Sequence, residues 1–236
     1  MMDQIRYLKD IDLCRQILAI MSTVYRPITL TELTAFLEPL KDMSDDHESL
    51  VQLVELCGSF LTLRHCTIYF IHQSSKDFLR EKAFDQISPF GIVHLHYTIY
   101  SASLRVMSET LRRDVYDLRH PGFPIDQVVQ PEPDPLAKAR YSCIYWVDHL
   151  QDCDPTRNAA HDLQDGGSVD GFLSRSYLHW LEALSLLGSM SKGVLSMAML
   201  DSLLQGETYR LMDFVRDGRR FIQSHKWAIE QSPLQL

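Results

Sequence analysis

Residues 68–79 constrain the fold most, because the chain changes there from strand periodicity to helix periodicity within a few positions. The apolar run over residues 67–71 is typical of a short strand and ends directly before His72. Residues 74–77, Ser-Ser-Lys-Asp, offer a hydroxyl N-cap with a carboxylate three positions on, which predicts the start of a helix. His72 is therefore expected at a fixed junction between a strand and a helix.

Two helical patterns begin the chain. Asp12 is expected to cap a first helix that ends before Pro27, because apolar residues repeat at helical spacing between them. A short extended piece over residues 28–30 follows. Thr31 is then expected to start a small helix that Pro39 ends.

A third helix and a hairpin complete the first module. The polar residues 41–47 predict a loop, and residues 49–57 predict a helix with Gly58 as its C-cap. The strand patterns of residues 60–63 and 67–71 are close enough to form a hairpin. Three helices, a hairpin and a closing helix in about 80 residues is the order of a winged helix, so residues 1–86 are expected to form a winged-helix domain.

The second module, residues 87–236, is expected to be entirely helical. Ser88-Pro89 is a typical helix start, and two apolar stripes over residues 90–111 predict a central packing helix. Five prolines make residues 120–135 an extended linker, and residues 151–168 are a polar loop expected to be mobile. Further helices are expected over residues 136–150, 169–174, 177–187, 192–204 and 207–225. The predicted fold class is mainly α: a winged helix with a small β-hairpin, followed by an α-helical bundle.

Charge and cysteine usage narrow the class of protein. The net charge of −8, from 23 Lys and Arg against 31 Asp and Glu, argues against a chain that mainly neutralises phosphates. The five cysteines are scattered and odd in number, which favours reduced thiols over a disulfide framework or a zinc site. No signal peptide and no apolar run of about 20 residues is present. The chain is expected to be soluble and cytoplasmic, without a membrane contact.

Motifs of catalysis are absent from the sequence. It contains no G-x-x-x-x-G-K-[ST] loop for nucleotide phosphates and no G-x-S-x-G elbow, so an enzyme is not expected. His94 and His96 point about 200° apart on a helix and cannot share one metal ion. His149 and His179, each beside an acidic or aromatic residue, are expected to make structural hydrogen bonds.

Nucleic-acid binding is the alternative class. A winged helix would insert residues 49–57 into the major groove, but this segment contains no Arg or Lys and carries one Glu. It is better suited to contact a protein. An aromatic group could stack bases, but its surroundings are not cationic, so we assign it to the core. Its members are Tyr141, Tyr145, Trp146, Tyr177 and Trp180.

His72 has two interpretations that its sequence context leaves open. The imidazole of a histidine after a strand commonly bonds to nearby backbone and is then structural. Alternatively, it can donate a hydrogen bond to an anion that another domain holds.

Several segments in order carry a family resemblance that covers nearly the whole chain. The chain resembles the region after the NACHT ATPase core in fungal signal-transduction ATPases of the heterokaryon-incompatibility type, many of which carry C-terminal WD or ankyrin repeats. The segments are DLC (12–14), VYRPITLTEL (24–33), IHQSSKDFL (71–79), YSCIYWVDHL (141–150), FL (172–173) and HWLEALSLL (179–187).

The resemblance implies a regulatory module without catalysis of its own. Its winged helix would adjoin the NACHT ATPase core, and its helical domain would link that core to the repeat sensor, with an oligomer forming on activation. In the family, the winged-helix histidine contacts the β-phosphate of ADP and holds the inactive state, and His72 matches that position. The plant version of the motif is Met-His-Asp, so Ile71 and Gln73 depart from it at both flanks.

The chain is expected to bind no nucleotide alone, since the P-loop and magnesium segments of the parent ATPase are not in it. One histidine supplies about 1.5–3 kcal/mol through a charge-assisted hydrogen bond. Even millimolar affinity requires about 4 kcal/mol. ADP and ATP would be cofactors of the ATPase core. The chain itself is expected to be a fragment of a longer protein or the product of a shortened gene model.

Overall fold

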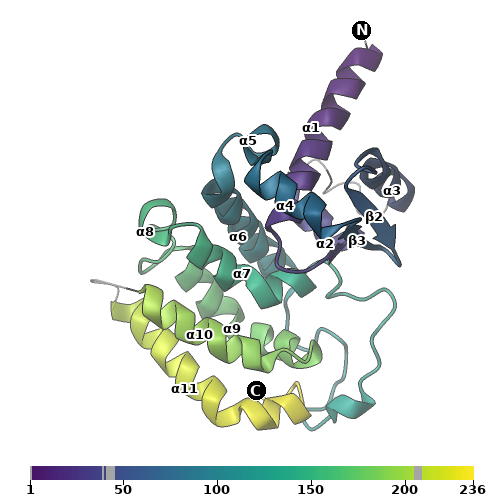
Figure 1. The fold of residues 1–236 in the computed structure, drawn as a ribbon. Coiled ribbons are helices and arrows are strands. Elements are labelled where there is room, and N and C mark those ends of the chain that lie inside the picture. Colours follow the sequence, from purple (N-terminus) through teal and green to yellow (C-terminus); the bar gives the residue numbers. More distant parts are fainter. Residues whose placement is uncertain (1, 39, 41–45, 205–208) are drawn as a thin grey trace. The chain divides into compact units, whose positions relative to one another are not determined.

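A computed structural model describes residues 2–38, 40, 46–204 and 209–236. It is mainly helical with one small antiparallel sheet, as the sequence predicts (Figure 1). The chain divides into two compact units, Met1–Ile99 (unit 1) and Tyr100–Leu236 (unit 2). The division falls inside α6 (Gly91–Thr110). The domain boundary after residue 86 stays a prediction.

The first helix of unit 1 begins earlier than expected. α1 spans Met2–Thr23, so the prediction that Asp12 caps it is wrong. Asp12 lies inside the helix and forms an exposed ion pair with Arg15, 3.4 Å away. No Gly or Pro interrupts residues 2–11, so nothing in the sequence prevents the helix from extending toward the N-terminus.

The second helix, α2 (Leu30–Phe36), is capped by Thr29 rather than by the predicted Thr31. Glu32 N donates to Thr29 Oγ1 (3.1 Å), and Thr29 N donates to Glu32 Oε2 (2.8 Å). This reciprocal pair is a capping box, in which two otherwise unpaired N–H groups find acceptors. Pro39 and most of the predicted 41–47 loop lie outside the described residues.

The predicted hairpin is present and belongs to a larger sheet. β2 (Leu61–Arg64) pairs with β3 (Thr67–Phe70), with Leu61 opposite Phe70 and Arg64 opposite Thr67. β1 (Ile28–Thr29) pairs with the other edge of β3, which gives the strand order β1-β3-β2. The turn contains two residues, His65 and Cys66, with φ of 47° and 62°. Such a turn matches the twist of the strands that it joins.

Helices surround this sheet and complete the core of unit 1. α3 spans His47–Leu56, where Asp46 Oδ1 accepts from Ser49 N (3.1 Å) at its start. α4 spans Gln73–Glu81 and is followed by the unexpected short helix α5 (Phe84–Ile87). The predicted helix start at Ser88-Pro89 is wrong, because these residues form a turn in which Gly91 N donates to Ser88 O (3.0 Å). The buried apolar residues of the unit include Ile17, Met21, Ile28, Leu33, Phe36, Leu50, Val54, Ile68 and Leu79.

Unit 2 starts with the second half of α6 and an irregular segment that contains a single 3-10 turn, η2 (Ile125–Gln127). The helix predicted from residue 136 begins only at α7 (Arg140–Asp152). Asp134 explains the difference, because its carboxylate accepts from Leu136 N (2.9 Å) and Arg140 Nε (2.7 Å) and so holds a turn. Residues 151–168, predicted to be a loop, include the short helix α8 (Pro155–Asn158).

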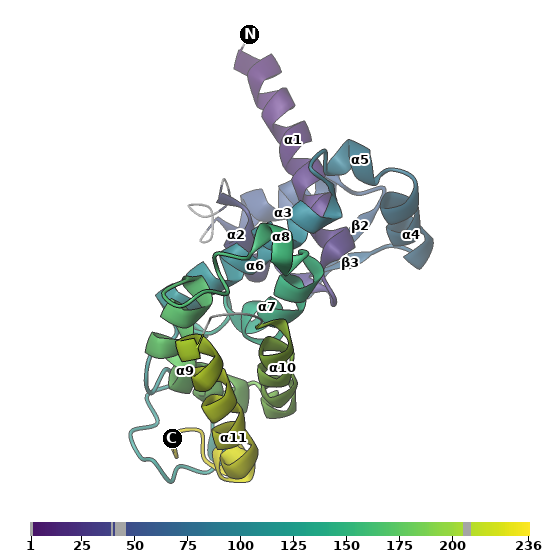
Figure 2. The ribbon, with the colours of Figure 1, turned by 90° about the vertical axis from the view of Figure 1, so that its left-hand side faces the viewer.

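Three long helices complete unit 2. α9 spans Ser168–Leu186 without the predicted break, since Arg175 and Ser176 interrupt a helix no more than their neighbours do. α10 (Met190–Leu203) lies beside α11 (Tyr209–Gln231) in both views (Figures 1 and 2). Gly188 joins α9 to α10 with a φ of 61°. α11 continues six residues beyond its predicted end.

Candidate nucleotide-contact site

His72 occupies the position directly before the first residue of α4. Its backbone is extended (φ −137°, ψ 146°), and its carbonyl accepts from Ser75 N at 3.0 Å. The side chain is exposed and does not cap the helix. The predicted hydroxyl cap by the serines at 74–75 is therefore wrong, because His72 already fills the N-cap position.

The His72 imidazole has no hydrogen-bond or ion-pair partner among the residues that the structure describes. It stands at the N-terminus of a nine-residue helix, where unpaired N–H groups and the helix dipole favour a negative charge. An exposed ring at this position can donate to an anion that approaches from outside. The described residues thus provide no hydrogen bond through which the His72 side chain would stabilise the fold.

A hollow of about 300 Å³ lies beside this helix start. Gln73 and Lys76 bring the first turn of α4 to it, whereas His72 does not line it. The hollow is lined by Met21, Tyr25, Arg26, Pro27, Ile68, Tyr69, Phe70, Gln73 and Lys76. It is thus formed by the end of α1, the strand β3 and the start of α4.

The two cations of the hollow are engaged within unit 1. Lys76 Nζ donates to Val24 O at 3.1 Å, and burial, followed by the charge of Arg80, lowers the pKa of the Lys76 ammonium. Arg26 donates to the Glu32 carboxylate and to Pro27 O (2.8 Å). Both cations therefore already have acceptors, and the Lys76 hydrogen bond ties the first turn of α4 to the residue that follows α1.

Sequence reasoning missed this supporting arrangement. The signal for the capping box was present, since Thr29 and Glu32 have the spacing of that motif. The pair of Arg26 and Glu32 had no such signal, because six residues separate them across a helix start. Lys76 was identified only as part of a cap, although it ties α4 to the end of α1.

The outer face of α3 does not suit DNA. Leu50, Leu53 and Val54 are buried, while Glu48 and Glu55 are exposed on a helix without Lys or Arg. A helix with this surface would repel phosphates. The expectation of a protein contact is consistent with this charge.

Among the other histidines, the expectation of a structural hydrogen bond is wrong for His179, which is partly exposed and has no such bond among the described residues. His94 is exposed and packs against Phe90 (ring centroids 5.3 Å apart), whereas His96 is buried. His149 is buried, with its Nε2 2.8 Å from the hydroxyl oxygen of Tyr141, so its structural role is confirmed. Within the described ranges, no group of three His, Cys, Asp or Glu side chains is placed to hold a metal ion.

The aromatic group belongs to the core of unit 2, as predicted. Trp146 and Trp180 are fully buried and contact each other edge to face, with centroids 5.8 Å apart. Trp180 Nε1 donates to Cys143 O at 2.8 Å. Tyr141 and Tyr177 are buried as well, and Tyr145 is partly exposed.

All five cysteines are free thiols, as the sequence predicts. Cys57, Cys143 and Cys153 are buried, and Cys66 is exposed. Burial, and secondly the charge of Asp162, raise the pKa of Cys153 to about 11.

In the part of the chain that the structure describes, no helix has the length and apolar character needed to cross a membrane.

Compared with known proteins, the chain is similar along its whole length to a fungal protein of vegetative incompatibility. This relative is the vegetative incompatibility protein HET-E-1 of Podospora anserina, with 49% identity over 251 aligned residues. The alignment covers 100% of this chain and 18% of HET-E-1. No protein-family model and no solved structure matches the chain.

Proposed function

We propose that the chain is a non-catalytic regulatory and interaction module of a NACHT-type signalling protein in fungal self/non-self recognition or programmed cell death. The observation that carries this proposal is the 49% identity to HET-E-1 over the whole chain. An identity of this size, spread over both units, supports a shared role for the whole segment. The module acts in the cytoplasm as part of a longer protein.

Unit 1 is the winged helix of the module, and His72 is its nucleotide contact. The ring donates a hydrogen bond to the β-phosphate of ADP that the NACHT ATPase core holds, and so favours the inactive state. Two features support this role: the imidazole is exposed without a partner among the described residues, and it stands at a helix N-terminus. ADP and ATP are bound by the core and not by this chain alone.

Unit 2 connects the ATPase core to the repeat sensor. Its buried aromatic residues support this role, because a rigid helical body can pass a displacement from one neighbour to the other. The partners are thus the NACHT core, the repeat domain and, on activation, further copies of the protein.

A chimera tests the proposal. Residues 1–236 replace the matching segment of HET-E-1, and the incompatibility reaction is scored in Podospora anserina. We expect the chimera to react as HET-E-1 does, because the segment would supply the same regulatory function. A chimera that accumulates to the level of HET-E-1 and gives no reaction would contradict the proposal.

His72→Ala in the chimera tests the regulatory residue. Its loss weakens the inactive state, so we expect a reaction without the incompatible partner. His94→Ala is the matched control, because His94 is also an exposed histidine of unit 1. An equal response to both substitutions would contradict the role of His72.

A further inference from the structure

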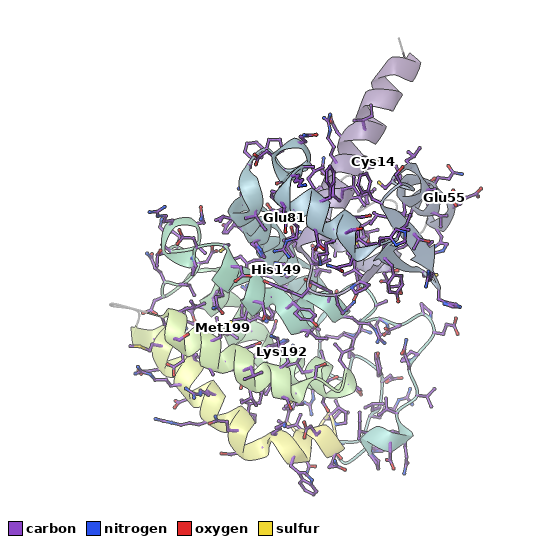
Figure 3. The ribbon with its side chains drawn as sticks, in the orientation of Figure 1. Cys14, Glu55, Glu81, His149, Lys192 and Met199 are labelled. Carbon is purple, nitrogen blue, oxygen red and sulfur yellow. The ribbon has the colours of Figure 1, made fainter. Side chains whose placement is uncertain are left out.

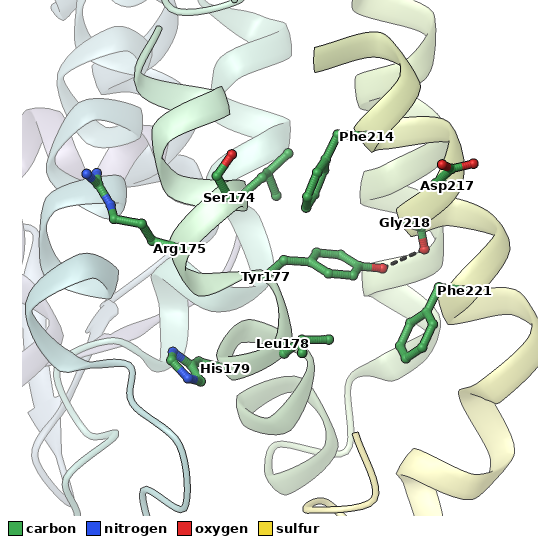
Figure 4. Close-up of a pocket in the computed structure, with 10 residues that line it drawn as sticks. Ser174, Arg175, Tyr177, Leu178, His179, Phe214, Asp217, Gly218 and Phe221 are labelled. Atoms are coloured by element: carbon green, nitrogen blue, oxygen red, sulfur yellow. Dashed lines mark hydrogen bonds between the residues drawn. The ribbon is translucent and has the colours of Figure 1, made fainter. Parts of the chain in front are cut away.

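A groove of about 610 Å³ runs between α9 and α11 in unit 2 (Figure 4). Its volume is in the range of pockets that bind ligands or side chains. The floor is mainly apolar and aromatic, and polar groups lie at its margins. The lining consists of Leu173, Ser174, Arg175, Tyr177, Leu178, His179, Phe214, Asp217, Gly218 and Phe221.

The aromatic floor of the groove is already fixed in position. The Tyr177 hydroxyl reaches across from α9 and donates to Gly218 O of α11 at 2.5 Å (Figure 4). Phe214 and Phe221 contact the Tyr177 ring edge to face, with centroids 5.7 and 6.5 Å away. Leu178 is 46% exposed beside them. A bound side chain therefore meets a preformed apolar surface.

The margin of the groove carries one cation, Arg175, and one carboxylate, Asp217. Arg175 is exposed on α9, and its guanidinium has no hydrogen-bond or ion-pair partner among the residues that the structure describes. Asp217, on the α11 margin, is already paired with Arg220 at 3.1 Å. Figure 4 shows Arg175 and His179 on the same side of α9. A matching occupant would combine a large apolar side chain with a carboxylate.

The outer face of α3 has this combination. Leu56 is 62% exposed, and the preceding residue, Glu55, which is labelled in Figure 3, is exposed as well. Glu48 and Gln52 continue that face toward the helix start. Neither Glu48 nor Glu55 has an ion-pair partner in the described ranges, and α3 contains no Lys or Arg. This acidic helix has no part in the proposed nucleotide contact.

We propose that the α9–α11 groove of one copy binds α3 of a second copy of this chain. Leu56 enters the apolar part of the groove, and Glu55 faces Arg175 across its margin. Helix-in-groove binding of this kind combines an apolar anchor with flanking charges. Because the two surfaces differ, the contact is head to tail. In a pair, one copy keeps its α3 and the other keeps its groove available for a further neighbour.

Photo-crosslinking tests the contact directly. Leu56 is replaced by benzoylphenylalanine, the purified chain is irradiated, and the adducts are separated by mass and sequenced. We expect an adduct with the mass of two chains that maps to residues 173–179 or 214–221. The same photoreactive residue at Val129, which is 82% exposed and outside both surfaces, is the control and should give no such adduct.

Charge reversal separates this contact from unspecific association. Arg175→Glu alone and Glu55→Lys alone should each lower the adduct yield about tenfold, as loss of one charge-assisted contact implies. Mixing the two single variants, with the photoreactive residue on the Glu55→Lys chain, should restore the yield because opposite charges again face each other. Circular dichroism melting confirms that each variant is folded.

Three outcomes would overturn the proposal. They are adducts confined to a single chain, adducts of two chains that map outside the groove, and variants that melt like the parent chain but show no recovery in the mixture. None of these results depends on a nucleotide or an ATPase core. The test of this contact is therefore independent of the test of His72.

Discussion

Arg26 and Glu32 form a bidentate ion pair in unit 1, with Nη2 2.6 Å from Oε1 and Nη1 3.0 Å from Oε2. The Glu32 side chain is only 1% exposed, and Oε2 also accepts from Thr29 N. One carboxylate therefore links the end of α1 to the start of α2. Arg26 also lines the hollow beside the start of α4.

Removal of the guanidinium should destabilise unit 1. Arg26→Met leaves the buried Glu32 carboxylate without its cation, so we expect the free energy of unfolding to fall by about 1.5–3 kcal/mol. Urea unfolding followed by circular dichroism measures the change. Arg15→Met is the matched control, because the Arg15–Asp12 pair is exposed and should contribute about 0.5 kcal/mol or less. Equal losses in the two variants would contradict the structural role of Arg26.

A substitution in the hairpin turn should stabilise unit 1. Cys66 has a φ of 62°, a conformation that costs a residue with a Cβ about 1 kcal/mol relative to glycine. Cys66→Gly should therefore raise the free energy of unfolding by about 1 kcal/mol. The same substitution at Cys14, inside α1, should lower it. A loss of stability at both positions would show that the turn conformation is wrong.

The two buried tryptophans should respond differently to the same change. Trp180 Nε1 donates to Cys143 O, whereas Trp146 Nε1 has no acceptor among the described residues. Trp180→Phe should cost about 1 kcal/mol more than Trp146→Phe, because only the former breaks a hydrogen bond. Chemical denaturation of both variants tests this order, and a larger loss for Trp146→Phe would contradict it.

Glu182 should make the stability of unit 2 depend on pH. Its side chain accepts from Asp114 N (3.0 Å) and Val115 N (2.9 Å), and burial raises the pKa of its carboxyl above the ordinary value. The folded state thus binds more protons than the unfolded state above about pH 4.3, and the free energy of unfolding falls as pH rises through the raised pKa.

Glu182→Gln removes this titration. The stability difference between the parent chain and the variant should be largest in favour of the parent at low pH and should shrink as pH rises. Urea midpoints measured from pH 4 upward provide the comparison. A difference that grows with pH would mean that the backbone donors, rather than burial, dominate the pKa of Glu182.

The sequence predicted the elements better than their ends. Alternating apolar residues located the hairpin to within one position, but His65 and Cys66 lack the Asn-Gly signature of a two-residue turn. The start of α7 was misplaced because Asp134 binds Arg140 and the backbone in a turn. That competition between a side chain and a helix depends on tertiary contacts, so residue pattern alone does not reveal it.

The position of His72 could be predicted from the sequence, but the hydrogen bonding of its side chain could not. The change of periodicity placed His72 between β3 and α4, where the structure has it. Whether its ring was bonded or free depended on the packing of α1, β3 and α4, which a single sequence does not specify. The ring is exposed and has no hydrogen-bond partner among the described residues, and its nucleotide contact stays a proposal.

The role of His72 can be measured directly as the rate at which a nucleotide leaves the chimera with HET-E-1. The purified chimera is loaded with fluorescent ADP, and release is followed after excess unlabelled ADP is added. Loss of one charge-assisted hydrogen bond of about 1.5–3 kcal/mol predicts release at least about tenfold faster in His72→Ala, with His94→Ala unchanged. Equal release rates in the parent chimera and in His72→Ala would contradict the proposal that this histidine holds the nucleotide.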